Sequence, residues 1–243
     1  MRSPFSEATP SALAGADVES LPESPDAGGY ASDPSTALLL KLEEGQGDVV
    51  RDGGPYGNVG FLRGGEWTRG RYGGGILLDG IDDHIQVPYS PSLALANTAG
   101  KLTLEAWLFP LGEADGVGAL IARPNAYVLE VIEGSDMRFR GGIWRGGMAL
   151  KITSSSRLER RAWQHLAMTF DGSSLRLYLG GVLDAQLPIG SGGIDAGTAD
   201  LFVGAHPLGG TPTRALSGIV DELRVSSVAR WPVPDPPVIE MVA

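Results

Sequence analysis

Hydrophobic and polar residues alternate along residues 163–187, whose sequence is WQHLAMTFDGSSLRLYLGGVLDAQL. The alternation runs through residues 163–170, stops at the Asp171-Gly172 pair, and resumes through residues 175–179. Two segments of period two that are joined by an Asp-Gly loop predict an antiparallel β-hairpin with one face in a core. A helix of the same sequence would spread its leucines around the helix axis. We therefore expect this hairpin to fix the register of the strands beside it.

Other parts of the chain show the same period. Residues 102–110, LTLEAWLFP, place an aliphatic residue at every second position, and an apolar run at residues 37–42 predicts a further strand before a loop rich in Gly, Asp and Pro. Weaker alternating runs occupy residues 119–122, 127–132, 137–140 and 148–153. Short strands at regular spacing, separated by turn residues, are typical of a β-sandwich and not of βαβ units.

Several of these segments also carry sequence motifs. Residues 78–87 read L-D-G-I-D-D-H-I-Q-V, and residues 216–225 read L-S-G-I-V-D-E-L-R-V. The hairpin adds a third motif, formed by Trp163, His165, Ala167, Asp171, Gly172, Leu177, Tyr178 and Gly181. Over about residues 37–231 the chain resembles the LamG-like jelly rolls of the concanavalin A-like lectin/glucanase superfamily, although Gly180 stands where many members have Asp. The resemblance implies an all-β fold, an antiparallel β-sandwich jelly roll.

Residues 1–36 differ in composition from the rest of the chain. They hold five prolines and six acidic residues against one arginine, a net charge of −5. Such a segment buries too little apolar surface to offset its ordering entropy, so we expect an extended N-terminal arm. Its apolar residues either bind a groove on a neighbouring molecule or pack on the arm's own domain: Phe5, Leu13, Val18, Leu21 and Tyr30. The predicted organisation is an arm at 1–36, a jelly-roll domain at 37–231 and a proline-rich tail at 232–243.

Length, charge and cysteine content narrow the class of protein further. A chain of 243 residues fits one large all-β domain, and the lack of cysteine excludes disulfides, thiolate metal sites and cysteine catalysis. The net charge of −10 disfavours binding to nucleic acid or to an anionic membrane. The sequence contains no apolar run of about eighteen residues, so no membrane-spanning helix is predicted. The N-terminus lacks the apolar core of a secretory signal.

Acidic residues gather at two places in the sequence. Asp79, Asp82 and Asp83 lie within five residues on a glycine-containing bend, and Asp221-Glu222 lie on a late strand. Carboxylates and carbonyl oxygens on a bend are the ligands that Ca²⁺ prefers, and the resemblance implies that such an ion is held in several related families. The candidate metal ligands are Asp79, Asp82 and Asp221. The alternative is that the bend residues cap turns through backbone amides and that Asp221 pairs with an arginine.

Catalytic motifs are absent from the sequence. The related glucanases use E-x-D-x-(x)-E, whereas Glu130 and Glu133 are three residues apart on a predicted strand and face opposite sides. No G-x-S-x-G, phosphate-binding loop or dinucleotide fingerprint occurs. The histidines show no zinc-binding spacing, and His165 is expected to be structural. The sequence therefore predicts a non-enzymatic protein.

Trp144 is the candidate for an exposed aromatic platform. It lies between Arg140 and Arg145 in the sequence RGGIWRGG. A tryptophan among arginines and glycines offers stacking surface, bidentate donors and close backbone approach, as sugar binding requires. Trp144, Arg140 and Arg145 are therefore the candidate ligand-binding residues, and the alternative is a tryptophan that covers an edge of the sandwich. Trp107 and Trp163 are expected to line the core.

Two classes of function fit these expectations. The first is a structural or decoration component of a larger assembly, such as a phage virion, anchored by its N-terminal arm with the jelly roll exposed. The alternative is a carbohydrate-binding, lectin-like or adhesion module of a surface protein. The expected partners are a protein or a second copy of the chain at residues 1–36 and a glycan at the jelly roll, and the expected location is a virion or cell-surface assembly. A fold alone does not decide between these classes.

Overall fold

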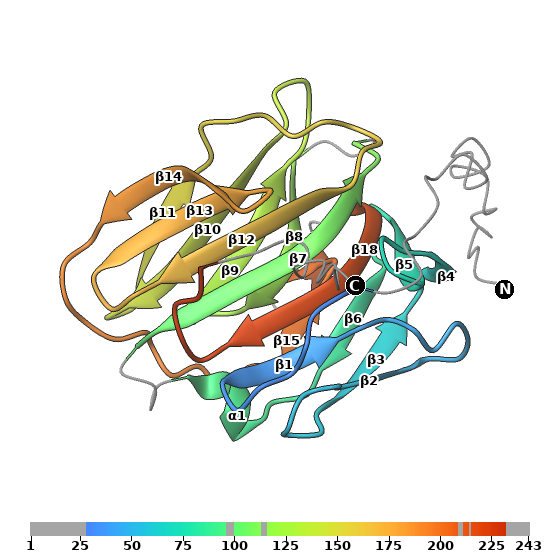
Figure 1. Ribbon diagram of the computed structural model, residues 1–243, viewed down its shortest axis with the longest axis horizontal. Coiled ribbons are helices and arrows are strands. Elements are labelled where there is room, and N and C mark those ends of the chain that lie inside the picture. Colours follow the sequence, from blue (N-terminus) through green and yellow to red (C-terminus); the bar gives the residue numbers. More distant parts are fainter. Residues whose placement is uncertain (1–27, 96–99, 113–115, 209–210, 214, 232–243) are drawn as a thin grey trace, which may run out of the picture.

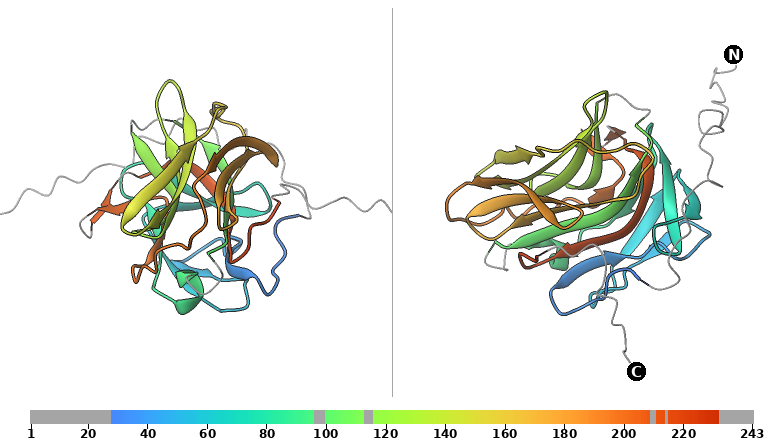
Figure 2. Two further views of the ribbon diagram at one scale, coloured as in Figure 1. Left: turned by 90° about the vertical axis from the view of Figure 1, so that its left-hand side faces the viewer. Right: turned by 45° about the horizontal axis from the view of Figure 1, so that its top comes forward.

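The computed structural model describes residues 28–95, 100–112, 116–208, 211–213 and 215–231. Within these residues two antiparallel sheets of eight strands pack face to face (Figure 1), and two further short strands pair as a small sheet of their own. The two layers are seen from other sides in Figure 2. This arrangement confirms the all-β sandwich that the alternation and the sequence motifs predict.

The first sheet, called sheet 1 here, contains the predicted hairpin at one edge. Its strands are, in spatial order, β14 (Val182–Pro188), β13 (Ser174–Leu179), β12 (Gln164–Phe170), β7 (Leu102–Pro110), β18 (Ser217–Ser226), β5 (Gly74–Asp79) and β4 (Glu66–Arg69). Strand β1 (Thr36–Leu40) also pairs with β18. The longest strands, β7 and β18, therefore lie near the middle of the sheet.

The second sheet, called sheet 2 here, faces sheet 1 across the core. Its strands are, in spatial order, β11 (Met148–Thr153), β10 (Arg138–Arg145), β9 (Tyr127–Ile132), β8 (Val117–Arg123), β15 (Leu201–Val203), β6 (His84–Val87), β3 (Val59–Arg63) and β2 (Val49–Arg51). The small sheet pairs β16 (His206–Leu208) with β17 (Thr211–Thr213), and α1 (Pro91–Ala94) is a single short turn. Across the described segments, no helix has the length and apolar character needed to cross a membrane.

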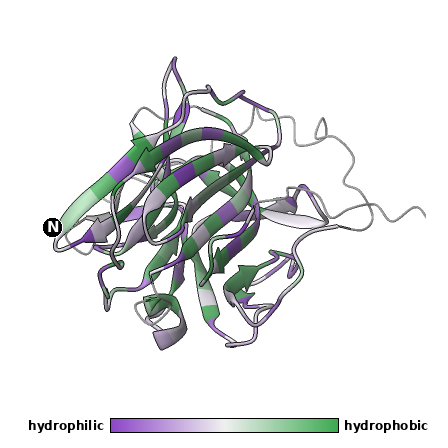
Figure 3. Ribbon diagram, turned by 60° about the vertical axis from the view of Figure 1, so that its left-hand side comes forward, coloured by the Kyte–Doolittle hydropathy of each residue, from purple (hydrophilic) through white to green (hydrophobic). Residues whose placement is uncertain are grey.

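The side-chain alternation decides which face of each strand enters the core. Leu104 and Leu108 of β7 and Met168 of β12 lie in the main hydrophobic cluster between the sheets. In the β7–β12 ladder Leu104 stands opposite Met168, so the core residues of neighbouring strands meet directly. Figure 3 shows hydrophobic and hydrophilic residues alternating along the strands. Burial of this cluster is the main term that holds the two sheets together.

The loop of the hairpin is fixed by Asp171. Its carboxylate accepts hydrogen bonds from the backbone N–H groups of Ser173 and Ser174 at 2.9 and 2.8 Å, and it pairs with Arg176 at 2.6 Å. Although partial burial raises the pKa of Asp171, these hydrogen bonds outweigh it and hold the pKa well below its usual range. The Asp-Gly loop of the sequence therefore becomes a turn that is closed by a charged acceptor.

The folded part of the chain begins earlier than residue 37. Tyr30 and Thr36 are buried, although the sequence analysis assigned both to the arm. The reason is that residues 28–35 lie along sheet 1 before β1 begins: Thr36 N–H donates to Asp33 O, and Asp33 pairs with Arg230 at 2.7 Å. The remainder of the predicted arm, residues 1–27, and the predicted tail, residues 232–243, lie outside the described residues.

Removal of the turn acceptor tests the account of the hairpin. Asp171→Ala leaves two backbone N–H groups and Arg176 without their acceptor, so we expect the free energy of unfolding to fall by about 1–2 kcal/mol. Urea unfolding followed by circular dichroism measures the change. Asp48→Ala, at an exposed loop position, is the control and is expected to change stability by less than about 0.5 kcal/mol. Equal losses in the two variants would contradict this account of the turn.

Candidate ligand-binding site

The predicted platform residue Trp144 lies on the outer face of sheet 2. Its half-buried ring packs against a small cluster of Ala119, Ala122 and Val128, and Lys151 Nζ lies 5.3 Å from the ring centroid. The tryptophan therefore has one face on the sheet and a cation beside it, which leaves little of the ring free for stacking.

The two predicted arginines have different surroundings. Arg140 shares the outer face with Trp144, and both Arg140 Nε and Lys151 Nζ bind the buried Glu130, at 2.6 and 2.7 Å. Arg145 faces the other way: its guanidinium donates to the backbone carbonyls of residues 189, 190, 192 and 193 and lies 5.4 Å from the ring of Phe170. The structure thus brings Trp144 and Arg140 together, and it uses Arg145 to hold a loop.

The acidic bend between β5 and β6 forms one compact group of carboxylates. Oxygen atoms of Asp79, Asp82 and Asp83 lie within 4.8 Å of one another. Asp79 Oδ1 accepts from Ile81 N–H at 2.7 Å, and Asp83 Oδ2 accepts from Asp79 N–H at 3.0 Å. Burial raises the pKa of Asp83, and the charges of its two acidic neighbours add to the rise. A bound divalent cation would offset this repulsion, so the group fits a hard cation with oxygen ligands.

Asp221 does not belong to that group. In the β18–β5 ladder Ser217 stands opposite Asp79, so Asp221 lies four residues further along β18. There its carboxylate accepts backbone N–H groups of Tyr72 at 2.8 Å and of Glu222 at 2.6 Å. The acidic group therefore consists of the three aspartates of the bend, with Asp83 in place of the predicted ligand Asp221. Strand pairing keeps Asp221 apart, because Ser217 stands opposite Asp79.

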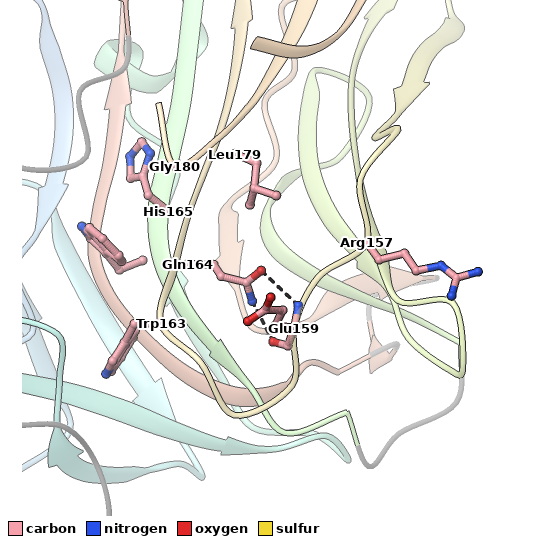
Figure 4. A pocket seen from close by; sticks show the side chains of 8 residues that line it. Arg157, Glu159, Trp163, Gln164, His165, Leu179 and Gly180 are labelled. Atoms are coloured by element: carbon pink, nitrogen blue, oxygen red, sulfur yellow. Dashed lines mark hydrogen bonds between the residues drawn. The ribbon is translucent and has the colours of Figure 1, made fainter. Parts of the chain in front are cut away.

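A pocket of about 430 Å³ opens where β12 begins, beside the outer face of sheet 1 (Figure 4). It is lined by Trp107, Arg157, Glu159, Trp163, Gln164, His165, Leu179 and Gly180. The side-chain amide of Gln164 accepts from Glu159 N–H at 3.1 Å and donates to Glu159 O at 2.7 Å. This pair of hydrogen bonds, drawn as dashed lines in Figure 4, fixes the loop that crosses from sheet 2 against the first residue of β12.

The alternation of β7 and β12 explains the aromatic wall of the pocket. Because the aliphatic residues of both strands fill the core, Trp107 and His165 point to the outer face, where they stand opposite each other in the ladder with ring centroids 5.6 Å apart. Trp163 packs against Phe109 at 5.6 Å, within a small outer cluster. Trp107 and Trp163 therefore lie outside the main core that they were expected to line.

Three side-chain nitrogens on this face are buried and have no hydrogen-bond partner among the described residues. They are Nε1 of Trp107, Nε1 of Trp163 and Nδ1 of His165. An unpaired buried donor or acceptor costs about 1–3 kcal/mol, so such groups are rare and mark places that serve more than stability. Their concentration around one pocket makes it the candidate site.

No ligand-binding role was predicted for this aromatic wall, although the sequence contains a pattern that indicates one. The outward positions of β7 and β12 include Glu105, Trp107, His165 and Thr169, in place of the lysines and glutamates of an ordinary solvent-exposed face. Mixed polar and aromatic residues at every second position indicate a covered or ligand-bound face.

A buried charge lies beneath the aromatic pair. Glu105 of β7 is fully buried; its Oε1 lies 2.7 Å from Arg224 Nη2, and its Oε2 lies 3.4 Å from His165 Nε2. Although burial raises the pKa of Glu105, the neighbouring His165 and the charge of Arg224 outweigh it and lower the pKa. Glu105 is therefore ionised at neutral pH and orients its two partners.

Two further carboxylates face the same side at an irregularity in β18. The register of β18 against β7 shifts between Asp221 and Arg224, and Glu222 adopts a left-handed backbone conformation with φ of 46°. Asp221 receives the N–H of Tyr72, and Glu222 Oε2 receives the N–H of Tyr30 at 2.6 Å. Burial raises the pKa of Asp221 to about 8, and burial also raises the pKa of Glu222.

The fold is that of the concanavalin A-like domains. Residues 79–232 match the Laminin_G_3 family model, of the Concanavalin A-like lectin/glucanases superfamily. Because the match covers more than half of the chain, the chain belongs to this family. No curated protein matches the chain in sequence.

Several solved structures with the same fold are described as binding domains. The binding domain of Paraclostridial Mosquitocidal Protein 1 superposes with a TM-score of 0.63 at 13% identity, over 81% of this chain and 49% of that chain. The receptor binding domain of botulinum neurotoxin C/D mosaic serotype gives 0.60 at 13% identity, over 81% and 48%. The chain thus spans about half the length of these toxin domains.

Domain 4 of AbnA, a GH43 extracellular arabinanase from Geobacillus stearothermophilus, was solved in complex with arabinotriose. It gives a TM-score of 0.61 at 16% identity, over 80% of this chain and 93% of that chain. At these identities the likeness establishes the fold and nothing about individual side chains.

The raised pKa of Asp221 predicts a pH dependence of stability. The folded state keeps a proton that the unfolded chain releases above about pH 4, so the stability contributed by this group is present at low pH and is lost as the pH rises from about 4 to about 8. Asp221→Asn removes the titration. Relative to the variant, the wild type is expected to lose stability between about pH 4 and about pH 8. Parallel pH profiles from urea unfolding would contradict the assignment.

Proposed function

We propose that the chain is a non-catalytic carbohydrate-binding module that holds its ligand in the pocket where β12 begins. The observation that carries the proposal is the composition of that pocket: two tryptophans, a histidine and a charged rim from Arg157 and Glu159 surround about 430 Å³. Sugars present apolar C–H faces that pack on aromatic rings and hydroxyl groups that need polar partners. Ligand pockets of this volume and mixture are common.

The structural neighbours support binding as the function. AbnA domain 4 has nearly the same extent as this domain and was solved with a saccharide, and the toxin domains are described as binding or receptor-binding domains. Arabinotriose is therefore the first ligand to test, as a probe of the pocket and not as the proposed natural ligand.

The lining of the pocket supports a non-catalytic role. The family description includes glucanases, whose chemistry needs two carboxyl groups beside the substrate. Among the residues that line the pocket, Glu159 alone carries a carboxyl group.

The alternative proposal is a decoration component of a larger assembly, anchored by residues 1–36. It rests mainly on residues 1–27, which lie outside the described part of the chain. The neighbouring structures favour the binding module over this alternative.

Substitution of one tryptophan on each sheet separates the two candidate ligand surfaces. Trp163→Ala removes a half-buried ring from the pocket, so we expect at least about tenfold weaker binding of arabinotriose, or of the best ligand from a glycan array. Trp144→Ala, also half-buried but on sheet 2, is the matched control and should bind as the wild type does. Titration calorimetry measures both, and circular dichroism checks folding. Loss of binding in the Trp144 variant alone would move the site to sheet 2, and a wild type that binds no glycan would overturn the function.

We propose Ca²⁺ as the ion for the group formed by Asp79, Asp82 and Asp83. Three carboxylates on one bend supply oxygen ligands of the kind Ca²⁺ prefers. Calorimetric titration with calcium chloride is expected to show saturable binding to the wild type and none to Asp82→Ala. Asp48→Ala, which removes an exposed charge elsewhere, should bind as the wild type does. Absence of binding to the wild type would leave the bend as a hydrogen-bonded turn.

A further inference from the structure

The segment that precedes β1 crosses the outer face of sheet 1 and meets the wall of the pocket. We propose that residues 28–32 form a strap that completes the ligand site, and that Tyr30 is a positioning residue that acts on the pocket through His165. What the site binds rests on the proposed function, whereas the docking of the strap rests on contacts within the chain. The strap is defined here as residues 28–32.

Tyr30 packs on the outer face of sheet 1 and is buried as fully as a core residue. It is 5% exposed, and its N–H donates to Glu222 Oε2 at 2.6 Å. The guanidinium carbon of Arg224 lies 4.2 Å from the centroid of the tyrosine ring, and Arg224 Nη1 also donates to Ala31 O at 3.2 Å. Three contacts together hold the strap in one position: the hydrogen bond to the Glu222 carboxyl group, the cation over the tyrosine ring, and the second backbone contact.

Two glycines permit this close approach. A Cβ atom on Gly29 would lie 2.2 Å from the carboxylate of Glu222, and Gly29 has φ of +86°. A Cβ atom on Gly28 would lie 2.1 Å from the ring of Tyr72. Side chains at these positions would push the strap away from the sheet, so both glycines are needed for the docked arrangement.

The strap reaches the pocket through a single side chain. The Tyr30 hydroxyl lies 2.5 Å from His165 Nε2, and the two rings meet edge to face with centroids 6.0 Å apart. His165 in turn lines the pocket and packs on Trp107, which also contacts Tyr72, with ring centroids 6.0 Å apart. Because Nε2 is engaged by both Tyr30 and Glu105, the orientation of the His165 ring is fixed by the docked strap.

The anchor of the strap is itself in an unusual conformation. Glu222 has a left-handed backbone at a buried strand position, which carries an energetic cost for a residue other than glycine. The irregularity places Asp221 and Glu222 so that one holds Tyr72 and the other holds Tyr30. The strained position therefore supports the two tyrosines that contact His165 and Trp107.

A pair of glycine substitutions in the full chain tests the strap. Gly29→Ala is expected to displace the strap, and Gly47→Ala is the matched control: its φ of +80° is similar, but no atom lies within 4 Å of its added Cβ. Imidazole ¹H–¹⁵N spectra should show displaced His165 resonances in Gly29→Ala and unchanged ones in Gly47→Ala. Affinity for the best glycan should fall about tenfold in Gly29→Ala alone.

Tyr30→Phe isolates the hydroxyl, because the ring and the backbone N–H remain. The His165 resonances are expected to move, and binding should weaken severalfold while the unfolding midpoint stays within the range of Gly47→Ala. If Gly29→Ala and Tyr30→Phe leave the His165 resonances and the affinity at the control level, the strap has no role in the site. If the wild type binds no glycan while the His165 resonances move only in Gly29→Ala and Tyr30→Phe, the proposed function fails and the docking of the strap is retained.

Discussion

The ion pair between the buried Glu105 and Arg224 is the contact on which the outer face of sheet 1 depends. It joins β7 to β18, and His165 of β12 approaches the same carboxylate from the other side, so three adjacent central strands share one anion. A buried charge is tolerated only when it is paired. This requirement fixes Arg224 and His165, and through them it fixes Tyr30 above the sheet and Trp107 beside it.

The two faces of sheet 1 consequently serve different purposes. The inner face holds the aliphatic residues that pack against sheet 2 and supply most of the hydrophobic stabilisation. The outer face holds paired charges, aromatic rings and three unpaired nitrogens, an arrangement that contributes less to stability than a simple apolar layer would. A face built in this way is better explained by recognition of a ligand than by folding alone.

Local pattern was sufficient to predict the sandwich and most of its strands, but it missed β2 and β3, which lie where a Gly- and Asp-rich loop was expected. Contacts between distant residues were not predictable. The alternation along β7 shows which residues share a face. Because every residue of β7 is buried, it does not show which face enters the core, and Trp107 was assigned to the wrong face. The separation of Asp221 from the acidic bend is likewise a property of strand pairing, because Ser217 and not Asp221 stands opposite Asp79. Tyr30 lies in a polar segment, and only its distant partners Glu222 and His165 explain its burial.

The most direct test of the ligand site uses the five tryptophans as reporters, because each indole N–H gives one signal in a ¹H–¹⁵N spectrum. Titration with arabinotriose, or with the best ligand from a glycan array, should shift the signals of Trp107 and Trp163 and leave that of Trp144 in place. Shifts confined to Trp144 would contradict the account, because they would place the ligand on sheet 2 and leave the aromatic face of sheet 1 without a binding role.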